Sequence, residues 1–447
     1  MTAPSTPETE QGWHRRVLTL ALPIILANLS TPLLGAVDTA VMGHLPDPAF
    51  IGGVSVGALV FSFLYWGFGF LRMGTTGFAA QALGADDPDE LRATLGRALL
   101  LAGGLGAGLI ALQWPIGAVA FAVVDATPAV LGHAETYFSI RIFSAPFALT
   151  NYAVLGWLLG TQRPRHALAL QVALNGVNIV LDLLFVAGLG MTIAGVAWAS
   201  LLAEVAAAAL GLAVCWRVLA RTGGRWSRER LLNRERLVAM LRVNRDIFVR
   251  TLALIFAFAF FTARGAAFGE VTLAANTVLM QFQQFLSHGL DGFAHATEIL
   301  VGRAVGGADR AWLRRAVRTA TLWAVILAAA AAVVFAGAGT LLIGVMTDLS
   351  AVRAAAASYL PWMVASPLLS VWAFQLDGIF IGATRTGPMR TAMLVSLAIY
   401  LGACWALIPI WGNHGLWLAL MVFMAARGIS LAAAYPRLVR AVTPAPA

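Results

Sequence analysis

The chain has 447 residues, of which 60% are hydrophobic and 11% charged, and its formal net charge is +9. Soluble domains carry about 25% charged residues, so this composition excludes an ordinary soluble fold and indicates a protein of the lipid bilayer. All the basic residues are Arg, and they lie in short gaps between apolar runs, which argues against a nucleic-acid-binding surface.

The amino-terminal residues 1–13 are polar and lack the charged start, short apolar core and cleavage site of a signal peptide. Twelve apolar runs follow, each long enough for the about 20 residues that a transmembrane helix needs. Runs longer than this minimum predict tilted or kinked helices. The expected helices are 17–42, 50–83, 92–114, 131–160, 164–187, 192–219, 246–268, 271–304, 313–337, 353–383, 388–410 and 413–436. Cys215 and Cys404 lie within apolar runs and are interpreted as packing residues.

The Arg residues divide unequally between the two sides that twelve alternating helices define. All but five of the 30 basic residues fall on one side. The exceptions are Arg72, Arg141, Arg264, Arg353 and Arg427. The positive-inside rule therefore predicts a multi-pass protein of the inner (plasma) membrane with both termini in the cytoplasm.

Residues of the first half of the sequence recur in the second half at one constant separation, the repeat spacing. Gly156 and Gly378, Gly160 and Gly382, and Tyr137 and Tyr359 are identical pairs with this same separation. We therefore expect two six-helix bundles related by pseudo-two-fold symmetry and inserted in the same orientation, with the substrate path between them. The predicted division is an amino-terminal tail at 1–13, a first bundle at 14–219, a cytoplasmic Arg-rich linker at 220–245, a second bundle at 246–440 and a carboxy-terminal tail at 441–447.

Two expected helices of the first half carry acids that lie at similar depth near the outer end. An acid inside the membrane is a functional candidate because inserting it is costly. Asp38 lies in the first helix after Pro23 and Pro32, which we expect to bend that helix; the alternative for Asp38 is a helix cap. The fifth helix presents a polar stripe on one face, made of Gln171, Asn175, Asn178 and Asp182.

These residues predict an ion-coupling site formed by Asp38, Asn178 and Asp182. Two neighbouring carboxylates repel each other, which favours uptake of a proton by one of them. Sodium is an alternative coupling ion because the same oxygens coordinate it. Interhelical hydrogen bonding is the alternative role of the amides. Asn175, Gln171, Asn151 and Glu204 either line the same cavity or pair with neighbouring helices.

The eighth helix carries a second polar stripe, spaced 4, 3, 4 and 3, made of Gln284, His288, Asp291, His295 and Glu298. It can line a cavity, relay protons or form a buried structural network. A metal site is disfavoured because one helix seldom supplies a full coordination shell. Asp377, near the cytoplasmic end of the tenth helix, is as well explained by packing or capping as by ion binding.

Motifs of enzymes and of ATP-driven pumps do not occur in the chain. A GxxxxGK[ST] loop is impossible without Lys, and neither HExxH nor GxSxG is present. We therefore expect a protein that is not an enzyme and has no cofactor.

The first-helix run PLLGAVDTAVMGHL, the fifth-helix NIVLD and the tenth-helix DGIFIGATRTGPMR resemble the multidrug and toxic compound extrusion (MATE) family, and most of all its DNA-damage-inducible protein F branch. The resemblance covers roughly residues 13–440. It implies a V-shaped, monomeric antiporter that exports small organic, amphipathic or cationic compounds in exchange for protons or sodium. It also implies an amino-half cation site at the matching residues Asp38, Asn178 and Asp182, with Asn151 as a polar partner.

The chain departs from some branches of the family in its seventh helix. That helix has no acid before Glu270 at its outer end, so the sequence favours the amino-half ion site. Two other functions remain as alternatives. A lipid-linked precursor flippase would need a strongly cationic cavity, and a membrane-embedded enzyme would use the eighth-helix stripe.

Overall fold

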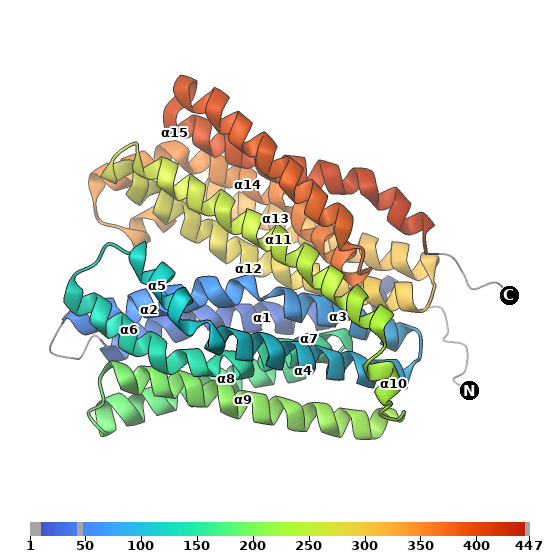
Figure 1. The fold of residues 1–447 in the computed structure, drawn as a ribbon. Helices are drawn as coiled ribbons and strands as arrows, with labels where there is room; N and C mark the ends of the chain where they lie inside the picture. Colours follow the sequence, from blue (N-terminus) through green and yellow to red (C-terminus); the bar gives the residue numbers. More distant parts are fainter. Residues whose placement is uncertain (1–9, 43–47, 443–447) are drawn as a thin grey trace. The chain divides into compact units, whose positions relative to one another are not determined.

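The computed structural model describes residues 10–42 and 48–442, and the side chains of residues 31–48 lie outside that description. Within the described ranges all regular structure is helical, as predicted. The first elements are α1 (Glu10–Met42), α2 (Pro48–Gly67), α3 (Phe70–Gly84), α4 (Pro88–Ala111), α5 (Gln113–Ala122), α6 (Pro128–Arg141), η1 (Ile142–Ser144), α7 (Ala145–Gly160), α8 (Pro164–Asp182), η2 (Leu183–Gly188) and α9 (Ile193–Thr222) (Figure 1). They are followed by α10 (Arg228–Leu231), α11 (Arg234–Ala266), α12 (Glu270–Gly306), α13 (Arg310–Met346), α14 (Ser350–Gly382) and α15 (Thr386–Arg440).

Two of the predicted membrane helices are interrupted. The run 50–83 forms α2 and α3, separated at residues 68 and 69. The run 131–160 forms α6 and α7 with a 3-10 turn between them. Pro146 lies in the first turn of α7, where its missing N–H removes no intrahelical hydrogen bond. A new helix therefore begins there.

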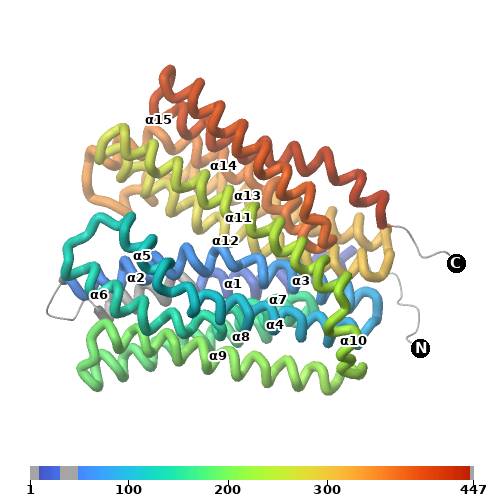
Figure 2. The backbone as a smooth tube through the Cα atoms, in the orientation of Figure 1, coloured from blue at the N-terminus to red at the C-terminus, as the bar shows by residue number. Residues whose placement is uncertain are grey.

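Helix α15 contains the last two predicted helices. The chain reverses its direction between them at a single residue. Gly412 has φ 55° and ψ −129° inside α15, and glycine is the residue that reaches this conformation without strain. Figure 2 shows α15 running to one end of its half and returning. All twelve predicted passes are thus helical in the structure, and two of them share one label.

Nine helices within the described ranges are long and apolar enough to cross a membrane. In this count α2 and α3 form one helix, α6 and α7 form another, and α15 is a single helix. Helix α12, which carries the predicted polar stripe, is not among the nine. The length and number of the apolar helices identify a multi-pass membrane protein.

The internal sequence repeat is also a repeat of backbone structure. A Cβ on Gly156 would meet the Arg72 carbonyl oxygen at 2.3 Å, and a Cβ on Gly378 would meet the Ala294 carbonyl oxygen at the same distance. Arg72 and Ala294 are themselves separated by the repeat spacing. The left-handed residues repeat in the same way, since Asp86 and Ala308 both have φ 52°, and Gln162 (φ 59°) corresponds to Thr384 (φ 51°). The two halves therefore share a local fold in detail.

The Arg-rich linker is partly helical. It forms α10 and the first turns of α11, which begins at Arg234 rather than near residue 246. The Asn233 side chain caps α11 by accepting a hydrogen bond from the Arg236 amide at 3.0 Å. Arg and Glu are good helix formers, so a charged stretch with a cap continues the membrane helix outward.

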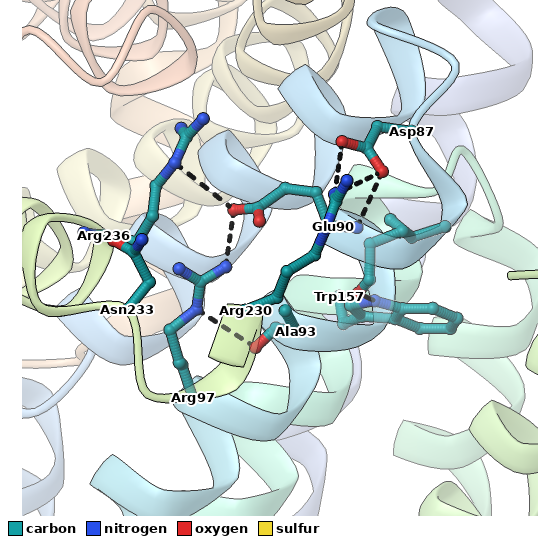
Figure 3. Close-up of polar contacts among 9 residues, drawn as sticks. Asp87, Glu90, Ala93, Arg97, Trp157, Arg230, Asn233 and Arg236 are labelled. Atoms are coloured by element: carbon teal, nitrogen blue, oxygen red, sulfur yellow. Dashed lines mark hydrogen bonds and ion pairs between the residues drawn. The ribbon is translucent and has the colours of Figure 1, made fainter. Parts of the chain in front are cut away.

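Ion pairs attach this linker to the start of α4 (Figure 3). Arg230 Nη1 lies 2.6 Å from Asp87 Oδ2. Glu90 Oε1 accepts a hydrogen bond from Arg97 Nη2 at 2.5 Å, and Arg236 Nε lies 4.0 Å from the same oxygen. Burial alone would raise the pKa of Asp87. The Glu90 amide and the Arg230 guanidinium outweigh that effect and hold the pKa of Asp87 below its usual range.

The contacts divide the chain into two compact units, Leu26–Leu241 and a second unit that combines Arg242–Ala447 with the chain up to Ile25. The predicted division has the whole first helix in the amino-terminal bundle. In the structure, the described residues before Ile25 pack on the second unit. Trp13 packs on Trp312 with ring centroids 4.8 Å apart, and the Trp323 indole N–H donates to His14 Nδ1 at 3.0 Å.

Candidate functional site

The polar stripe of α8 lies inside the amino-half unit. Asp182 is 0% exposed and Asn178 is 2% exposed, so neither side chain faces lipid. The helix changes character just beyond Asp182, because η2 is a π-helical segment. Such segments are uncommon and occur often at functional sites. The stripe is thus a buried polar surface that ends at an irregular turn.

Amides connect this stripe to α1 and α9. Gln171 donates to Asn175 Oδ1 at 3.2 Å, and Asn175 in turn donates to Ser30 Oγ at 3.0 Å. With the Asn178 amide oriented to satisfy both of its ends, its nitrogen donates to Asp182 Oδ2 and its oxygen accepts from the Ser200 backbone N–H, each at 3.2 Å. The structure therefore brings Asn178 and Asp182 together as predicted, and their role in ion coupling stays a prediction.

Of the three predicted functional residues in the first helix, Pro23, Pro32 and Asp38, the structure describes the side chain of Pro23. Asp38 and Pro32 lie in α1, but their side chains fall outside the described residues. Pro23 lies within the continuous helix and is partly buried. The approach of Asp38 to Asp182 and the bending of the helix at these prolines remain predictions.

Asn151 and Glu204 form a pair between α7 and α9. The Asn151 amide donates to Glu204 Oε2 at 2.6 Å and to the Glu204 carbonyl oxygen at 3.1 Å. This contact favours the alternative in which the two residues pair across neighbouring helices over the one in which they line the cavity.

Arg141, which the sequence analysis did not connect with any site, is an electrostatic neighbour of Glu204. Its guanidinium donates to the Tyr137 hydroxyl and lies 5.2 Å from the centre of the Phe61 ring. The signal that could have found it is its position among the five Arg residues away from the Arg-rich side.

The stripe of α12 does not act as one surface. Gln284 is exposed and His288 Nδ1 lies 2.7 Å from the Gln284 carbonyl oxygen of its own helix. Further along, His295 Nδ1 lies 3.1 Å from Glu298 Oε2, and both side chains are buried. No group of three His, Cys, Asp or Glu side chains among the described residues is arranged to hold a metal ion. Of the three alternatives for this stripe, which were cavity lining, proton relay and a buried structural network, its buried half fits the structural network.

Asp377 lies at the centre of a buried charge network in the carboxy half. Arg427 Nη2 donates to Asp377 Oδ2 at 2.8 Å, and Arg250 donates to the same oxygen. All three side chains are buried. Arg250 is one of the Arg residues on the Arg-rich side, and Arg427 is one of the five on the other side. The two ion pairs make Asp377 a structural junction of α11, α14 and α15.

These observations define a multi-pass helical membrane protein, built from two repeated halves with buried polar networks. The MatE family model matches residues 23–184 and 247–405. The chain therefore belongs to the MATE family, a family of transporters rather than enzymes, as the sequence analysis predicted.

Two curated proteins and one solved structure illustrate the relationship. The chain is 43% identical over 425 residues to the DNA damage-inducible protein F of Escherichia coli, which covers 95% of this chain and 91% of that protein. It is 28% identical over 318 residues to the probable multidrug resistance protein NorM of Caulobacter vibrioides, covering 67% of this chain and 64% of that protein. A crystal structure of MATE in complex with MaL6 superposes with a TM-score of 0.85 at 20% identity, covering 96% and 97% of the two chains. The predicted fold is confirmed.

Proposed function

We propose that the chain is a secondary active antiporter that exports small organic, amphipathic or cationic compounds in exchange for protons or sodium. The observation that carries this proposal is the buried Asn178–Asp182 pair at the start of the π-helical segment. A carboxylate and amide oxygens inside a membrane are ligands for a small cation and acceptors for a proton. The multidrug resistance named for one relative supports an organic substrate.

The proposed coupling site consists of Asp38, Asn178 and Asp182. Cation or proton binding neutralises the carboxylates, and release toward the other side restores their charge. The Ser30 contact of Asn175 links the α8 stripe to α1, so a change of charge on α8 is positioned to act on α1. We propose that Pro23 and Pro32 then let α1 bend. The other cavity-lining candidates are Gln171, Asn175, Gln284, His288 and Asp291, whereas Asn151, Glu204 and His295 take part in side-chain pairs.

The proposed location is the inner (plasma) membrane with both termini in the cytoplasm, because the Arg-rich gaps lie on one side of the predicted passes. The transporter is proposed to work as a monomer on substrates that reach it from the cytoplasm or the inner leaflet.

Efflux of a fluorescent organic cation from proteoliposomes tests the proposal. A proton gradient and a sodium gradient are imposed separately on the wild type, Asp38→Asn, Asp182→Asn and Asp125→Asn. Asp125 is exposed and precedes α6, so its variant controls for the loss of one negative charge. We expect one gradient to drive export, both intramembrane variants to lose it, and Asp125→Asn to retain it.

Export that survives in Asp182→Asn would refute the coupling site. A correctly inserted wild type that exports no organic cation under either gradient would refute the antiporter. Deletion of the gene followed by accumulation of a lipid-linked precursor on the wrong leaflet would support a flippase instead.

A further inference from the structure

A groove lies between α13 and the final turns of α15, at the Arg-rich end of the carboxy-half helices. It encloses about 550 Å³ and is lined by Arg314, Val317, Arg318, Tyr435, Pro436, Val439 and Arg440. Arg310 fixes the two walls together, because its Nε donates to the Val442 carbonyl oxygen at 3.0 Å and its Nη2 to the Arg440 carbonyl oxygen at 2.9 Å. The α13–α15 groove is therefore a built hollow of the carboxy-half unit.

Three guanidinium groups rim this groove, those of Arg314, Arg318 and Arg440. Arg314 and Arg318 are exposed one turn apart on α13. Among the described residues, neither has an ion pair, and the side chain of Arg440 bonds only to the carbonyl oxygen of Pro436 in its own helix. None of the residues that line the groove in the described part of the chain is acidic. Clustered Arg side chains with free donors are suited to phosphate, whose oxygens accept hydrogen bonds in a fork geometry.

The corresponding place in the amino half is filled by the chain itself. Arg92 corresponds to Arg314, and its guanidinium donates to the Leu219 carbonyl oxygen at 2.5 Å and the Gly223 carbonyl oxygen at 2.6 Å. Gly96 corresponds to Arg318, and a Cβ there would meet Leu231 of the linker at 2.6 Å and Trp226 at 3.2 Å.

The ion pair between Arg230 and Asp87 secures that cover (Figure 3). Two equivalent positions of one fold thus differ. The linker covers the first, and the second is an open groove at which Arg314 and Arg318 have no ion pair with any described residue.

The floor of the groove is apolar. The remaining lining residues are Val317, Tyr435, Pro436 and Val439. Tyrosine is enriched at the level of lipid headgroups, and basic pockets between membrane helices bind anionic headgroups. We propose that the α13–α15 groove binds an anionic phospholipid, with its phosphate on Arg314, Arg318 and Arg440 and its glycerol region on the apolar floor.

Native mass spectrometry of the detergent-purified full-length protein titrated with dioleoyl phosphatidylglycerol tests this inference. Dioleoyl phosphatidylcholine provides the neutral arm, and excess inorganic phosphate provides a competitor without acyl chains. The double variant Arg314→Gln/Arg318→Gln should bind phosphatidylglycerol about 30-fold more weakly, since each Arg near a membrane surface contributes about a fivefold gain. The matched control is Arg228→Gln/Arg234→Gln, which removes two exposed Arg residues of the linker region.

A second variant separates a built site from general positive charge. Val317→Trp places an indole in the groove, much as Trp226 lies over the amino-half position, and leaves every Arg in place. We expect it to weaken phosphatidylglycerol binding at least fivefold while its elution on size exclusion stays that of the wild type.

Equal loss in the linker control, or undiminished binding by Arg314→Gln/Arg318→Gln, would overturn the inference. Phosphatidylcholine binding as tight as phosphatidylglycerol would overturn it too. Displacement by inorganic phosphate at millimolar concentration would identify a site for free phosphate in place of a lipid. None of these variants touches the proposed coupling residues, so the result is independent of whether the chain proves to be an antiporter.

Discussion

Helix α8 and the first segment of α15 occupy equivalent positions in the two halves but differ completely in polarity. The four polar residues of the α8 stripe correspond, one repeat later, to Met393, Leu397, Tyr400 and Cys404. The backbone of the two halves repeats down to its left-handed residues. Sequence divergence on a common scaffold has therefore given one half a buried amide–carboxylate site and left the same place in the other half nearly apolar.

The carboxy half has its buried charges elsewhere. Asp377 joins Arg250 and Arg427, and its counterpart one repeat earlier is Leu155. Asp377 is held by two ion pairs, whereas Asp182 has the amide of Asn178 as its neighbour. We therefore predict a structural role for the carboxy-half network and a coupling role for the amino-half site, and experiments on each half test the two predictions.

The largest effect is expected for Asp377→Ala. It leaves two buried Arg residues facing each other, and breaking a buried pair costs about 3–5 kcal/mol. Thermal unfolding of the purified protein measures the loss. Asp348→Ala is the matched control, because Asp348 is 103% exposed in its ion pair with Arg353 and such pairs contribute about 0–1 kcal/mol. Equal shifts in the two variants would show that the network contributes nothing.

Where the halves are alike, equal substitutions should have equal effects. Gly156→Ala and Gly378→Ala each force a methyl group onto a backbone carbonyl oxygen at 2.3 Å, and overpacking of this kind costs about 1–3 kcal/mol. Gly103→Ala and Gly402→Ala are controls in open space and should leave the melting temperature unchanged or slightly raised. A large effect in one half only would contradict the repeat of helix packing.

The polar stripe of α8 has no polar counterpart in the carboxy half, so substitutions at equivalent positions should have different effects on transport. Asn178→Ala removes the amide between Asp182 and Ser200 and should lower gradient-driven export about tenfold, because a buried partner left unpaired costs about 1–3 kcal/mol. Tyr400→Phe, at the equivalent position, should keep export within about twofold. Initial efflux rates from proteoliposomes at equal protein content provide the measurement. Loss of export in Tyr400→Phe would disprove the assignment of coupling to one half.

The smallest expected effect is on how the stability of the folded protein depends on pH. The pKa of Asp87 is lowered in the folded protein, so its contribution is present above the unfolded value of about 3.9 and is lost as pH falls through the lower folded value. Arg230→Gln should lower the melting temperature slightly near pH 7, and the difference from the wild type should vanish at more acidic pH. A difference that grows on acidification would contradict the sign. Arg234→Gln, nearby and without an acidic partner among the described residues, is the control.

Much of the fold was predictable because hydrophobic length and Arg distribution depend on the bilayer alone. The pairs Gly156 with Gly378 and Gly160 with Gly382 also revealed the repeat, because a close helix crossing tolerates only glycine there. The division of α6 from α7 and the early start of α11 were not predicted. Both depend on local signals, Pro146 at a helix start and Asn233 as a cap, which long apolar runs conceal.

The site was predictable in part for a similar reason. Spacing of 4, 3 and 4 places residues on one face, so the α8 stripe was found. Spacing along one helix does not show which helix faces it, and the partners Ser30, Ser200 and Arg427 came only from the structure. The α12 stripe shows the same difficulty, since regular spacing suggested one surface and the neighbours of α12 bury only part of it.

The packing of the first residues of α1 on the second unit has a consequence for synthesis. The indole N–H of Trp323 reaches His14 across 309 residues of chain, and a Cβ on Gly292 would meet Ile25 Cγ1 at 2.2 Å. This segment leaves the ribosome before its partners in α12 and α13, so it can dock only after they have been made. Its docking is a long-range and late step of assembly, and a nascent chain halted before α13 lacks the surface on which this segment settles.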